Sequence, residues 1–261
     1  MTNQNNFDDF GYWRCEKVKK GYLTIDDGPS CDRREKVDIL QRYNIPAIWF
    51  CLGKELELNR ESSIYTIRSG GIIGNHSYSH PRFSELSLDE CYEEIIKTDR
   101  IIDQLYACAE VDRPVKIFRF PYGDRGVGTS FYDFNYNPVE EKRLHDLQMM
   151  LAELGYSCPT FSDIEYEYYK LNREKKYLDW YWTYDVMEWC VFQTPPQYGI
   201  KGLAEVLELM DLNLPERWAG LNYEKSADII LIHDHPQTTY LFEDIIIGLL
   251  AKEIIFENPV K

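Results

Sequence analysis

The sequence has no cluster of lysine and arginine, no long apolar run and no C-x-x-C pair, and each absence excludes a class of protein. Acidic residues outnumber basic ones by 44 to 29, which gives a formal net charge of −15. Nucleic-acid binding needs basic clusters, so we expect no such partner. No apolar run approaches the ~20 residues of a membrane-spanning helix. Residues 1–9 are polar and acidic, unlike a signal peptide, and we therefore expect a cytoplasmic protein without a membrane span.

The cysteines also favour a cytoplasmic location. There are seven of them, scattered along the chain, and this pattern argues against a disulfide framework and against a cysteine-based zinc site. Unpaired thiols in a reducing compartment are the expectation. A chain of 261 residues fits one large α/β domain or two small ones. Because no repeat, low-complexity tract or linker interrupts it, we expect one domain over residues 1–261.

Strand-like apolar runs alternate with helical patterns, which predicts an α/β fold with parallel strands. The runs predict strands at residues 21–25, 46–52, 70–74, 115–120, 156–161, 177–185 and 227–232. Helices are predicted from Ser30 or Asp32 toward Tyr43, and at 55–68, 140–154, 203–212 and 239–252, and a capping box over residues 87–90 opens another long helix. Residues 123–137 are predicted as a loop and residues 163–176 as an inserted helix or excursion.

Two adjacent carboxylates, Asp26 and Asp27, lie where the first predicted strand ends. Two negative charges side by side are costly there unless a cation or a shared proton is present. Active sites of α/β folds collect at such strand ends. The other chemically active side chains also follow strand-like runs, and they are His76, His80, Arg119, Asp185 and His233. Groups at the same ends of parallel strands meet in space, so we expect a single site.

The H-x-x-x-H spacing of His76 and His80 predicts a metal site. One helical turn or a tight loop brings both imidazoles to one side, where one carboxylate of the Asp pair completes a set of two histidines and one acid. Zinc suits this set, because catalytic zinc commonly keeps three protein ligands and a water. Iron(II), cobalt, manganese and nickel also bind such ligands. The alternative interpretation is two surface histidines one turn apart.

The remaining histidines differ in expected role. His233 follows directly on the apolar run 227–232, which fixes it at the rim of the sheet and favours a role in the site. His235 is expected to alternate away in an extended chain, or to lie in the next turn. His145 lies within a predicted helix and is expected to be structural.

Five segments in order resemble the motifs of the NodB-homology polysaccharide deacetylases, carbohydrate esterase family four. They are Thr24-Ile25-Asp26-Asp27-Gly28-Pro29, His76-Ser77-Tyr78-Ser79-His80, Arg119-Phe120-Pro121-Tyr122-Gly123, Asp185-Val186-Met187-Glu188-Trp189 and Leu231-Ile232-His233-Asp234. The resemblance extends over most of the chain. It implies a distorted, incomplete (β/α) barrel, usually with about seven parallel strands.

The resemblance also implies roles, position by position. Asp27, His76 and His80 match the metal triad. Asp26 matches the general base, and Arg119 the residue that orients it. The backbone N–H of Tyr122, beside Pro121, matches an oxyanion donor, while Trp189 and Leu231 match the walls of the acetyl pocket. His233 matches the general acid and Asp185 the carboxylate that tunes it. The fourth motif usually ends in Asp-Trp; here it ends in Glu188-Trp189, and we assign the tuning role to Asp185.

The implied function is a metal-dependent hydrolase that removes N-acetyl groups from an amino sugar. The sugar would belong to an oligosaccharide, or to a lipid-linked or nucleotide-linked precursor of a surface polysaccharide. Alternatives are an amidohydrolase acting on a non-sugar amide, a non-catalytic carbohydrate-binding relative, and a structural protein with an acidic surface. The loops 123–137 and 163–176 look like additions near the substrate groove. The sequence sets neither the native metal nor the oligomeric state.

Overall fold

A parallel β-sheet forms the centre of the computed structural model, which describes residues 19–128, 135–212 and 221–260. The strand order is β3–β2–β1–β5–β4, and β6 pairs with β1. The strands are β1 (Lys20–Asp27), β2 (Ala47–Cys51), β3 (Ile72–Asn75), β4 (Tyr184–Asp185), β5 (Asp228–His233) and β6 (Ile255–Phe256). Each pairing between these strands is parallel. The predicted α/β class is therefore confirmed, while the single domain over residues 1–261 stays a prediction.

The regular sheet stays open, and two isolated parallel bridges extend it beyond β3. Asn75 bridges to Phe118, and Phe118 bridges to Asp179. The chain then continues from Asp179 into β4, which pairs with β5. The result is the expected distorted, incomplete barrel.

Three predicted strands are shorter than expected or absent. Residues 115–120 contribute only the two bridges at Phe118, and residues 177–185 contribute the bridge at Asp179 and the two residues of β4. Pro114 and Pro121 bracket the first of these segments, and neither has an N–H to give to a strand ladder. Residues 156–161, which include Pro159, form no strand.

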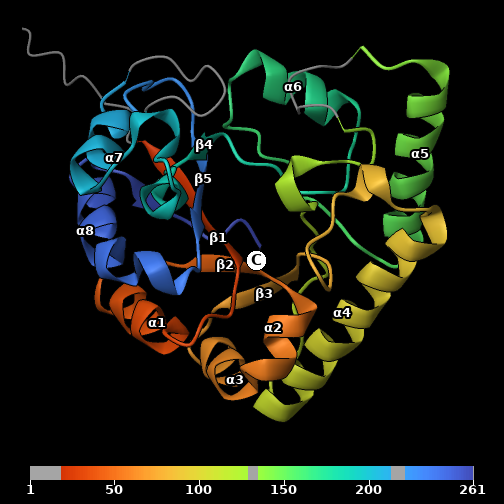
Figure 1. The fold of residues 1–261 in the computed structure, drawn as a ribbon, viewed down its shortest axis with the longest axis horizontal. Helices are drawn as coiled ribbons and strands as arrows, with labels where there is room; N and C mark the ends of the chain where they lie inside the picture. The colour runs from red at the N-terminus through yellow and green to blue at the C-terminus, as the bar shows by residue number, and fades with distance from the viewer. Residues whose placement is uncertain (1–18, 129–134, 213–220, 261) are drawn as a thin grey trace, which may run out of the picture.

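Helices surround one side of the strands, with α8, α1, α3, α2 and α4 following one another around it in Figure 1. Their bounds are α1 (Arg33–Arg42), α2 (Gly53–Leu58), α3 (Arg60–Arg68), α4 (Leu88–Ala109), α5 (Pro138–Glu153), α6 (Glu167–Glu174), α7 (Leu203–Met210) and α8 (Thr239–Leu250). The predicted capping box is present at α4, where Ser87 and Glu90 bond reciprocally. The helix predicted over 55–68 is divided at Asn59, whose side chain donates to the Pro29 carbonyl at 3.0 Å.

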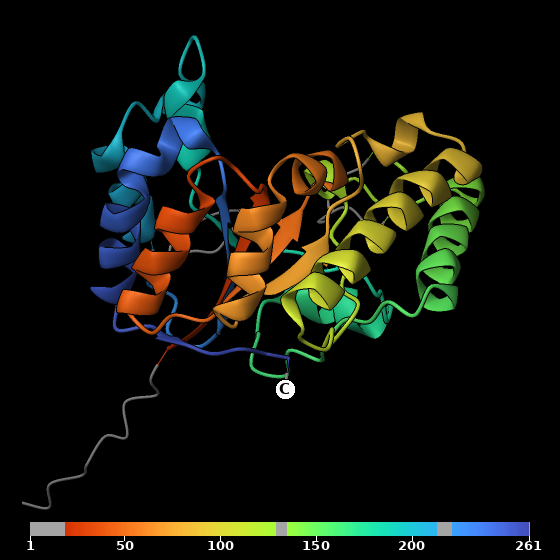
Figure 2. The same cartoon turned by 90° about the horizontal axis from the view of Figure 1, so that it is seen from below.

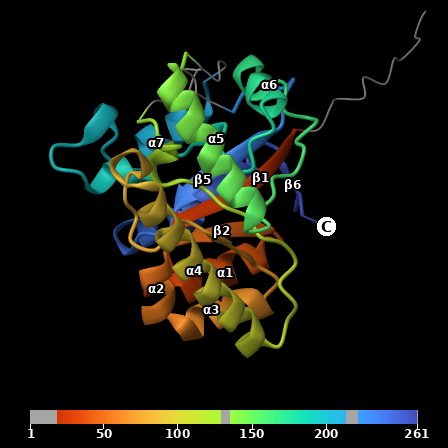
Figure 3. The same ribbon diagram turned by 90° about the vertical axis from the view of Figure 1, so that its right-hand side faces the viewer.

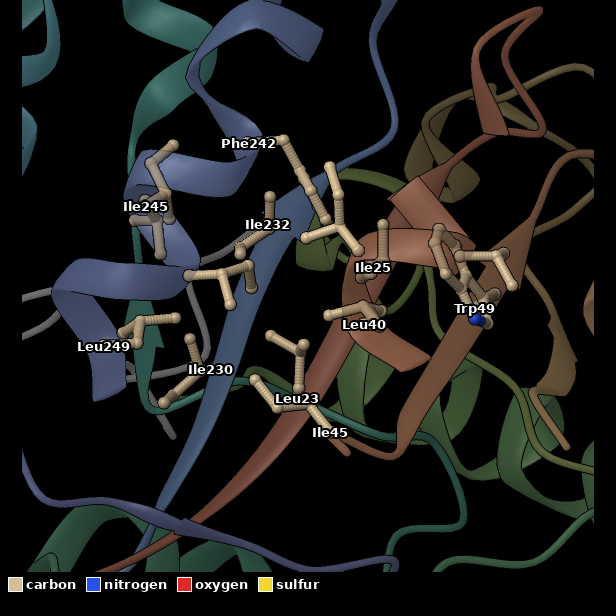
Figure 4. Close-up of a cluster of buried hydrophobic side chains, with 14 of the residues drawn as sticks. Leu23, Ile25, Leu40, Ile45, Trp49, Ile230, Ile232, Phe242, Ile245 and Leu249 are labelled. Atoms are coloured by element: carbon tan, nitrogen blue, oxygen red, sulfur yellow. The ribbon is translucent and has the colours of Figure 1, made fainter. Parts of the chain in front are cut away.

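The largest apolar cluster lies between the sheet and helices α1 and α8 (Figure 4). Leu23 and Ile25 of β1 point into it, because alternate residues of a strand share a face. Thr24 and Asp26 therefore point to the opposite face, toward the inside of the incomplete barrel. The burial of β1 on both faces thus fixes which of the two adjacent carboxylates is directed inward.

The two 3-10 turns η3 (Glu188–Phe192) and η4 (Gln197–Gly199) belong to a segment that stands out from the body, as Figures 2 and 3 show. Within the described residues, no helix combines the length and the hydropathy that crossing a bilayer requires. The six described cysteines are unpaired, and Cys15 lies outside the described residues. Part of the predicted loop 123–137 also lies outside them, because residues 129–134 are not described.

A buried ion network joins the turn after β1 to the turn after β5. The Asp234 carboxylate accepts hydrogen bonds from Arg33 Nε at 2.5 Å, Lys36 Nζ at 2.6 Å and Ser30 Oγ at 2.6 Å. All of these side chains are buried. Burial alone would raise the pKa of Asp234, but the two cations hold it well below its usual value. Gly28 permits this approach, because a Cβ there would overlap the Asp234 carboxylate.

Replacing Asp234 by Asn leaves Arg33 and Lys36 buried without a counter-charge. We expect the free energy of unfolding in urea at pH 7 to fall by about 3–5 kcal/mol. The exposed Asp112→Asn substitution is the matched control and should change it by less than about 0.5 kcal/mol. Because the pKa of Asp234 is lowered by folding, the wild-type advantage is full above about pH 4 and declines as the pH falls toward the folded pKa. Equal stability of the two variants would contradict the role given to this network.

Candidate active site

A cleft of about 800 Å³ opens at the carboxyl ends of the strands. It is lined by most of the predicted site residues, namely Asp26, Asp27, His76, His80, Tyr122, Asp185, Trp189, Leu231 and His233. Arg119 is fully buried beneath the cleft and reaches it through Asp26. Pro121 is buried beside Tyr122 and is not among the lining residues. The sequence-distant motifs therefore meet at one place.

Asp27, His76 and His80 present ligand atoms that lie within 4.8 Å of one another. Asp27 Oδ1 is 3.4 Å from His76 Nε2 and 3.2 Å from His80 Nε2. His76 Nδ1 lies 2.8 Å from the Arg119 carbonyl oxygen. That acceptor places the ring proton on Nδ1 and leaves the Nε2 lone pair directed to Asp27, which is how metal-binding histidines are oriented. The donor set fits a divalent cation such as zinc.

Four residues in and beside the site have a backbone in the left-handed region, which residues other than glycine seldom adopt. The φ angles are 74° at Asp27, 67° at Ser77, 66° at His80 and 58° at Tyr122. Such positions cost of order 1–3 kcal/mol each and gather at functional sites. At Asp27 the consequence is direct, because neighbours in a regular strand point to opposite faces. The left-handed turn brings Asp27 to the same cleft as Asp26.

Asp26 is held by Arg119 rather than by the histidines. Arg119 donates from one terminal nitrogen to Asp26 Oδ1 at 2.7 Å and to Thr24 Oγ1 at 2.9 Å. Its guanidinium also lies over the Phe50 ring, 4.3 Å from the centroid. The other carboxylate oxygen, Asp26 Oδ2, is 3.7 Å from His76 Nε2. Asp26 thus lies beside the metal triad, and one of its oxygens is paired with the Arg119 guanidinium.

The structure pairs His233 with Glu188, whereas the sequence predicts Asp185 in that place. Glu188 Oε1 lies 3.1 Å from His233 Nδ1 and accepts the His233 backbone N–H at 2.6 Å. Met187 has a φ of 64°, and Glu188, which follows it, contacts the end of β5. Asp185 instead accepts the Met187 N–H at 2.8 Å and the Trp189 Nε1–H at 3.3 Å. Asp185 thereby orients the wall of the cleft.

The charges around His233 favour its protonated form. Burial lowers the pKa of His233, but the negative charges of Glu188 and then Asp185 outweigh it and raise the pKa to about 10. Burial raises the pKa of Asp185 to about 6, and the Glu188 charge adds to this while His233 opposes it. At neutral pH the imidazole can therefore donate a proton across the cleft from Asp26.

His235 also lies in the cleft, and the expectation that it alternates away is wrong. Its Nε2 is 2.8 Å from Asp27 Oδ2, and its ring stacks on His233 with centroids 5.3 Å apart. The signal was present in the sequence, because residues i and i+2 of an extended chain share a face. Burial would raise the pKa of Asp27, but the hydrogen bond from His235 and the close approach of the His76 and His80 rings hold it well below the usual value.

The outer wall contains residues that none of the motifs includes. They are Arg82, Trp182, Phe192, Gln193, Gln197, Tyr198 and Gln237. The Arg82 guanidinium lies 4.3 Å from the centroid of Tyr122, whose ring is 4.4 Å from that of His80. Among the described residues, the predicted additions 123–137 and 163–176 do not line the cleft, and η3 and η4 do. Only the general richness in aromatic residues pointed to this wall.

Comparison with known proteins agrees with the motifs. Residues 14–135 match the family model described as polysaccharide deacetylase. Over 103 residues the chain is 37% identical to a peptidoglycan-N-acetylglucosamine deacetylase of Bacillus cereus, an alignment that covers 39% of this chain and 36% of that protein. The chain thus spans little more than a third of that curated relative. The resemblance to the polysaccharide deacetylases is confirmed.

Solved structures share the fold over nearly the whole chain. A family 4 carbohydrate esterase from Streptomyces lividans, in complex with acetate, matches with a TM-score of 0.59 at 21% identity and covers 92% of this chain and 94% of that one. A mutant of a CE4 family pseudoenzyme with restored enzymatic activity matches with a TM-score of 0.58 at 20% identity, over 92% and 66% of the two chains. At these identities the likeness shows the fold alone, so activity has to be argued from the site.

Replacing Glu188 by Gln removes the charge that raises the pKa of His233. In the wild-type protein the imidazolium persists to about pH 10, and we expect the variant to lose this proton at lower pH. Because folding raises this pKa, the charged ring stabilises the fold below about pH 6.5 and the contribution is lost as the pH rises to about 10. Titration of the ring nitrogens by 15N NMR measures the shift, with the exposed Glu224→Gln as control. An unchanged titration midpoint would exclude Glu188 as the controlling charge.

Proposed function

From the confirmed resemblance to the polysaccharide deacetylases, we propose that this protein is a metal-dependent hydrolase that removes N-acetyl groups from an amino sugar. One observation carries the proposal. The cleft holds a two-histidine, one-carboxylate triad between Asp26, which is paired with Arg119, and His233, which is paired with Glu188. Amide hydrolysis needs an acceptor for the proton of water and a donor for the leaving nitrogen, and these two residues supply them.

The proton traffic divides between the two sides of the cleft. A divalent cation bound by Asp27, His76 and His80 would polarise the acetyl carbonyl and acidify a water. Asp26 accepts a proton from the water that adds to the carbonyl carbon. The backbone N–H of Tyr122 is assigned to the carbonyl oxygen. His233 gives its proton to the nitrogen as the C–N bond breaks, so that acetate and an amine leave.

The walls of the cleft support a sugar over another amide. Trp182, Trp189, Tyr122 and Tyr198 line it, and flat aromatic faces combine apolar area with polar edges that suit a sugar ring. A non-catalytic carbohydrate-binding protein would have no need of this complete set of proton-transferring groups. A non-sugar amide remains the second candidate, which a panel of N-acetylated substrates separates.

Arg82 supports a substrate that carries a negative charge. Asp26 and Asp27 line the same cleft, yet no acid among the described residues pairs with Arg82, whose exposed guanidinium rests on the Tyr122 ring. The two centroid distances, 4.3 and 4.4 Å, place it no more than about 8.7 Å from the centre of the His80 ring. A phosphate of a lipid-linked or nucleotide-linked sugar fits this position. We propose a precursor of a surface polysaccharide, handled in the cytoplasm, and the unpaired cysteines support that compartment.

Acetate release tests the activity. Protein stripped with a chelator should release no acetate from N-acetylated oligosaccharides or nucleotide-linked sugars, and zinc or cobalt should restore release. The Asp26→Asn variant should bind the metal as wild type does and lose about 100- to 10,000-fold in rate, with Asp112→Asn as control. Tight metal binding without acetate release from any N-acetylated amine would identify a binding protein instead.

The charge on Arg82 tests the substrate class. We expect Arg82→Gln to lower kcat/KM about tenfold on a nucleotide-linked N-acetyl sugar, the effect of losing one charge-assisted hydrogen bond. On a neutral N-acetylated chito-oligosaccharide the value should be unchanged. Arg100→Gln, on the exposed side of α4, is the matched control. Equal losses on both substrates would show that Arg82 only supports the cleft wall.

A further inference from the structure

We propose that His235 is a positioning residue that holds the metal-ligating carboxylate of Asp27 and thereby sets the affinity for the cation. The inference rests on the proposed function only for the identity of the metal triad. His235 belongs to none of the five motifs, which end at Asp234. Its contact with Asp27 is seen in the structure.

The two oxygens of Asp27 have different partners. Oδ1 faces the two histidines of the triad, at 3.4 Å from His76 Nε2 and 3.2 Å from His80 Nε2. Oδ2 lies 2.8 Å from His235 Nε2. With Oδ2 held by a hydrogen bond, the carboxylate offers a single oxygen to a cation. Ligating carboxylates are commonly fixed in this way by a partner outside the coordination sphere.

The position of the His235 ring is determined by the fold around it. Its backbone carbonyl accepts a hydrogen bond from the buried Lys36 Nζ at 3.1 Å. One face of the ring stacks on His233, with an interplanar angle of 19°, and Phe192 meets it edge-on at 5.3 Å. The side chain is only 25% exposed. These contacts fix the ring before any ligand arrives, so its hydrogen bond to Asp27 is preorganised.

The hydrogen-bond pattern also assigns the ring a tautomer. Nδ1 of His235 is buried and has no hydrogen-bond partner among the described residues. A proton on Nε2, donated to Asp27, leaves Nδ1 with a lone pair, which is less costly to bury alone than an N–H. The ring therefore acts through Nε2 as a donor to the carboxylate and not as a ligand. It acts through Asp27.

The experiment compares His235→Ala with His235→Gln, whose amide nitrogen can still reach the carboxylate. The dissociation constants for zinc and cobalt are measured by competition with a chromophoric chelator on the full chain. We expect His235→Ala to weaken binding by about 10- to 100-fold and His235→Gln to recover most of the loss. The exposed His145→Ala is the matched control and should bind as wild type does. The zinc concentration for half-maximal acetate release should rise by the same factor while KM for the sugar stays unchanged.

Three results would overturn the proposal. An unchanged affinity in His235→Ala would show that Asp27 needs no such support. X-ray absorption in which the number of bound imidazoles falls from three to two in His235→Ala would make His235 a direct ligand. If the wild-type protein binds neither zinc nor cobalt, the proposed function is wrong as well. The first two results contradict only the role of His235. Urea unfolding of the metal-stripped variants checks their folding, and His235→Gln supplies the comparison if His235→Ala is unfolded.

Discussion

The site depends on how the chain leaves β1. In a regular strand Asp26 and Asp27 would point to opposite faces of the sheet, and only one of them would reach the cleft. The left-handed backbone of Asp27 removes that constraint. The conformation is maintained from below, where the Asp234 N–H donates to the Asp26 carbonyl oxygen at 2.8 Å and the Asp234 carboxylate is fixed by Arg33 and Lys36. The strained backbone of Asp27 is thus supported by a buried ion network that lies below the cleft.

Three of the ionised groups in and beneath the cleft have a counter-charge of their own. Asp26 has Arg119, Asp234 has Arg33 and Lys36, and His233 has Glu188. The carboxylate of Asp27 differs, because its partners among the described residues are three imidazoles, which carry charge only when protonated. A largely enclosed carboxylate ringed by imidazole nitrogens is an environment in which a divalent cation is strongly stabilising.

Regular periodicity made the framework and most of the site predictable from sequence. The strands β1, β2, β3 and β5 lie where apolar runs predict them, and the polar residues that end them meet as parallel strands require. Three features escaped prediction because they depend on irregular backbone or on tertiary contacts. Glu188 and not Asp185 contacts His233 Nδ1, directly after the left-handed Met187, and the strand at 115–120 is reduced to the two bridges of Phe118 between two prolines. The wall with Arg82 and Tyr198 comes from segments without a periodic pattern.

The two sides of the cleft favour opposite protonation states, an ionised carboxylate on one side and a protonated imidazole on the other. On one side a guanidinium is placed against Asp26, and on the other two carboxylates are placed against His233. Pairs of titratable groups whose surroundings separate their proton affinities are how one protein performs acid and base chemistry at a single pH. Asp185 shows that the pairing has a cost, since its pKa rises to about 6 under burial and the charge of Glu188. Asp185 is therefore protonated more readily than an ordinary carboxyl group, close to the residue that must give a proton away.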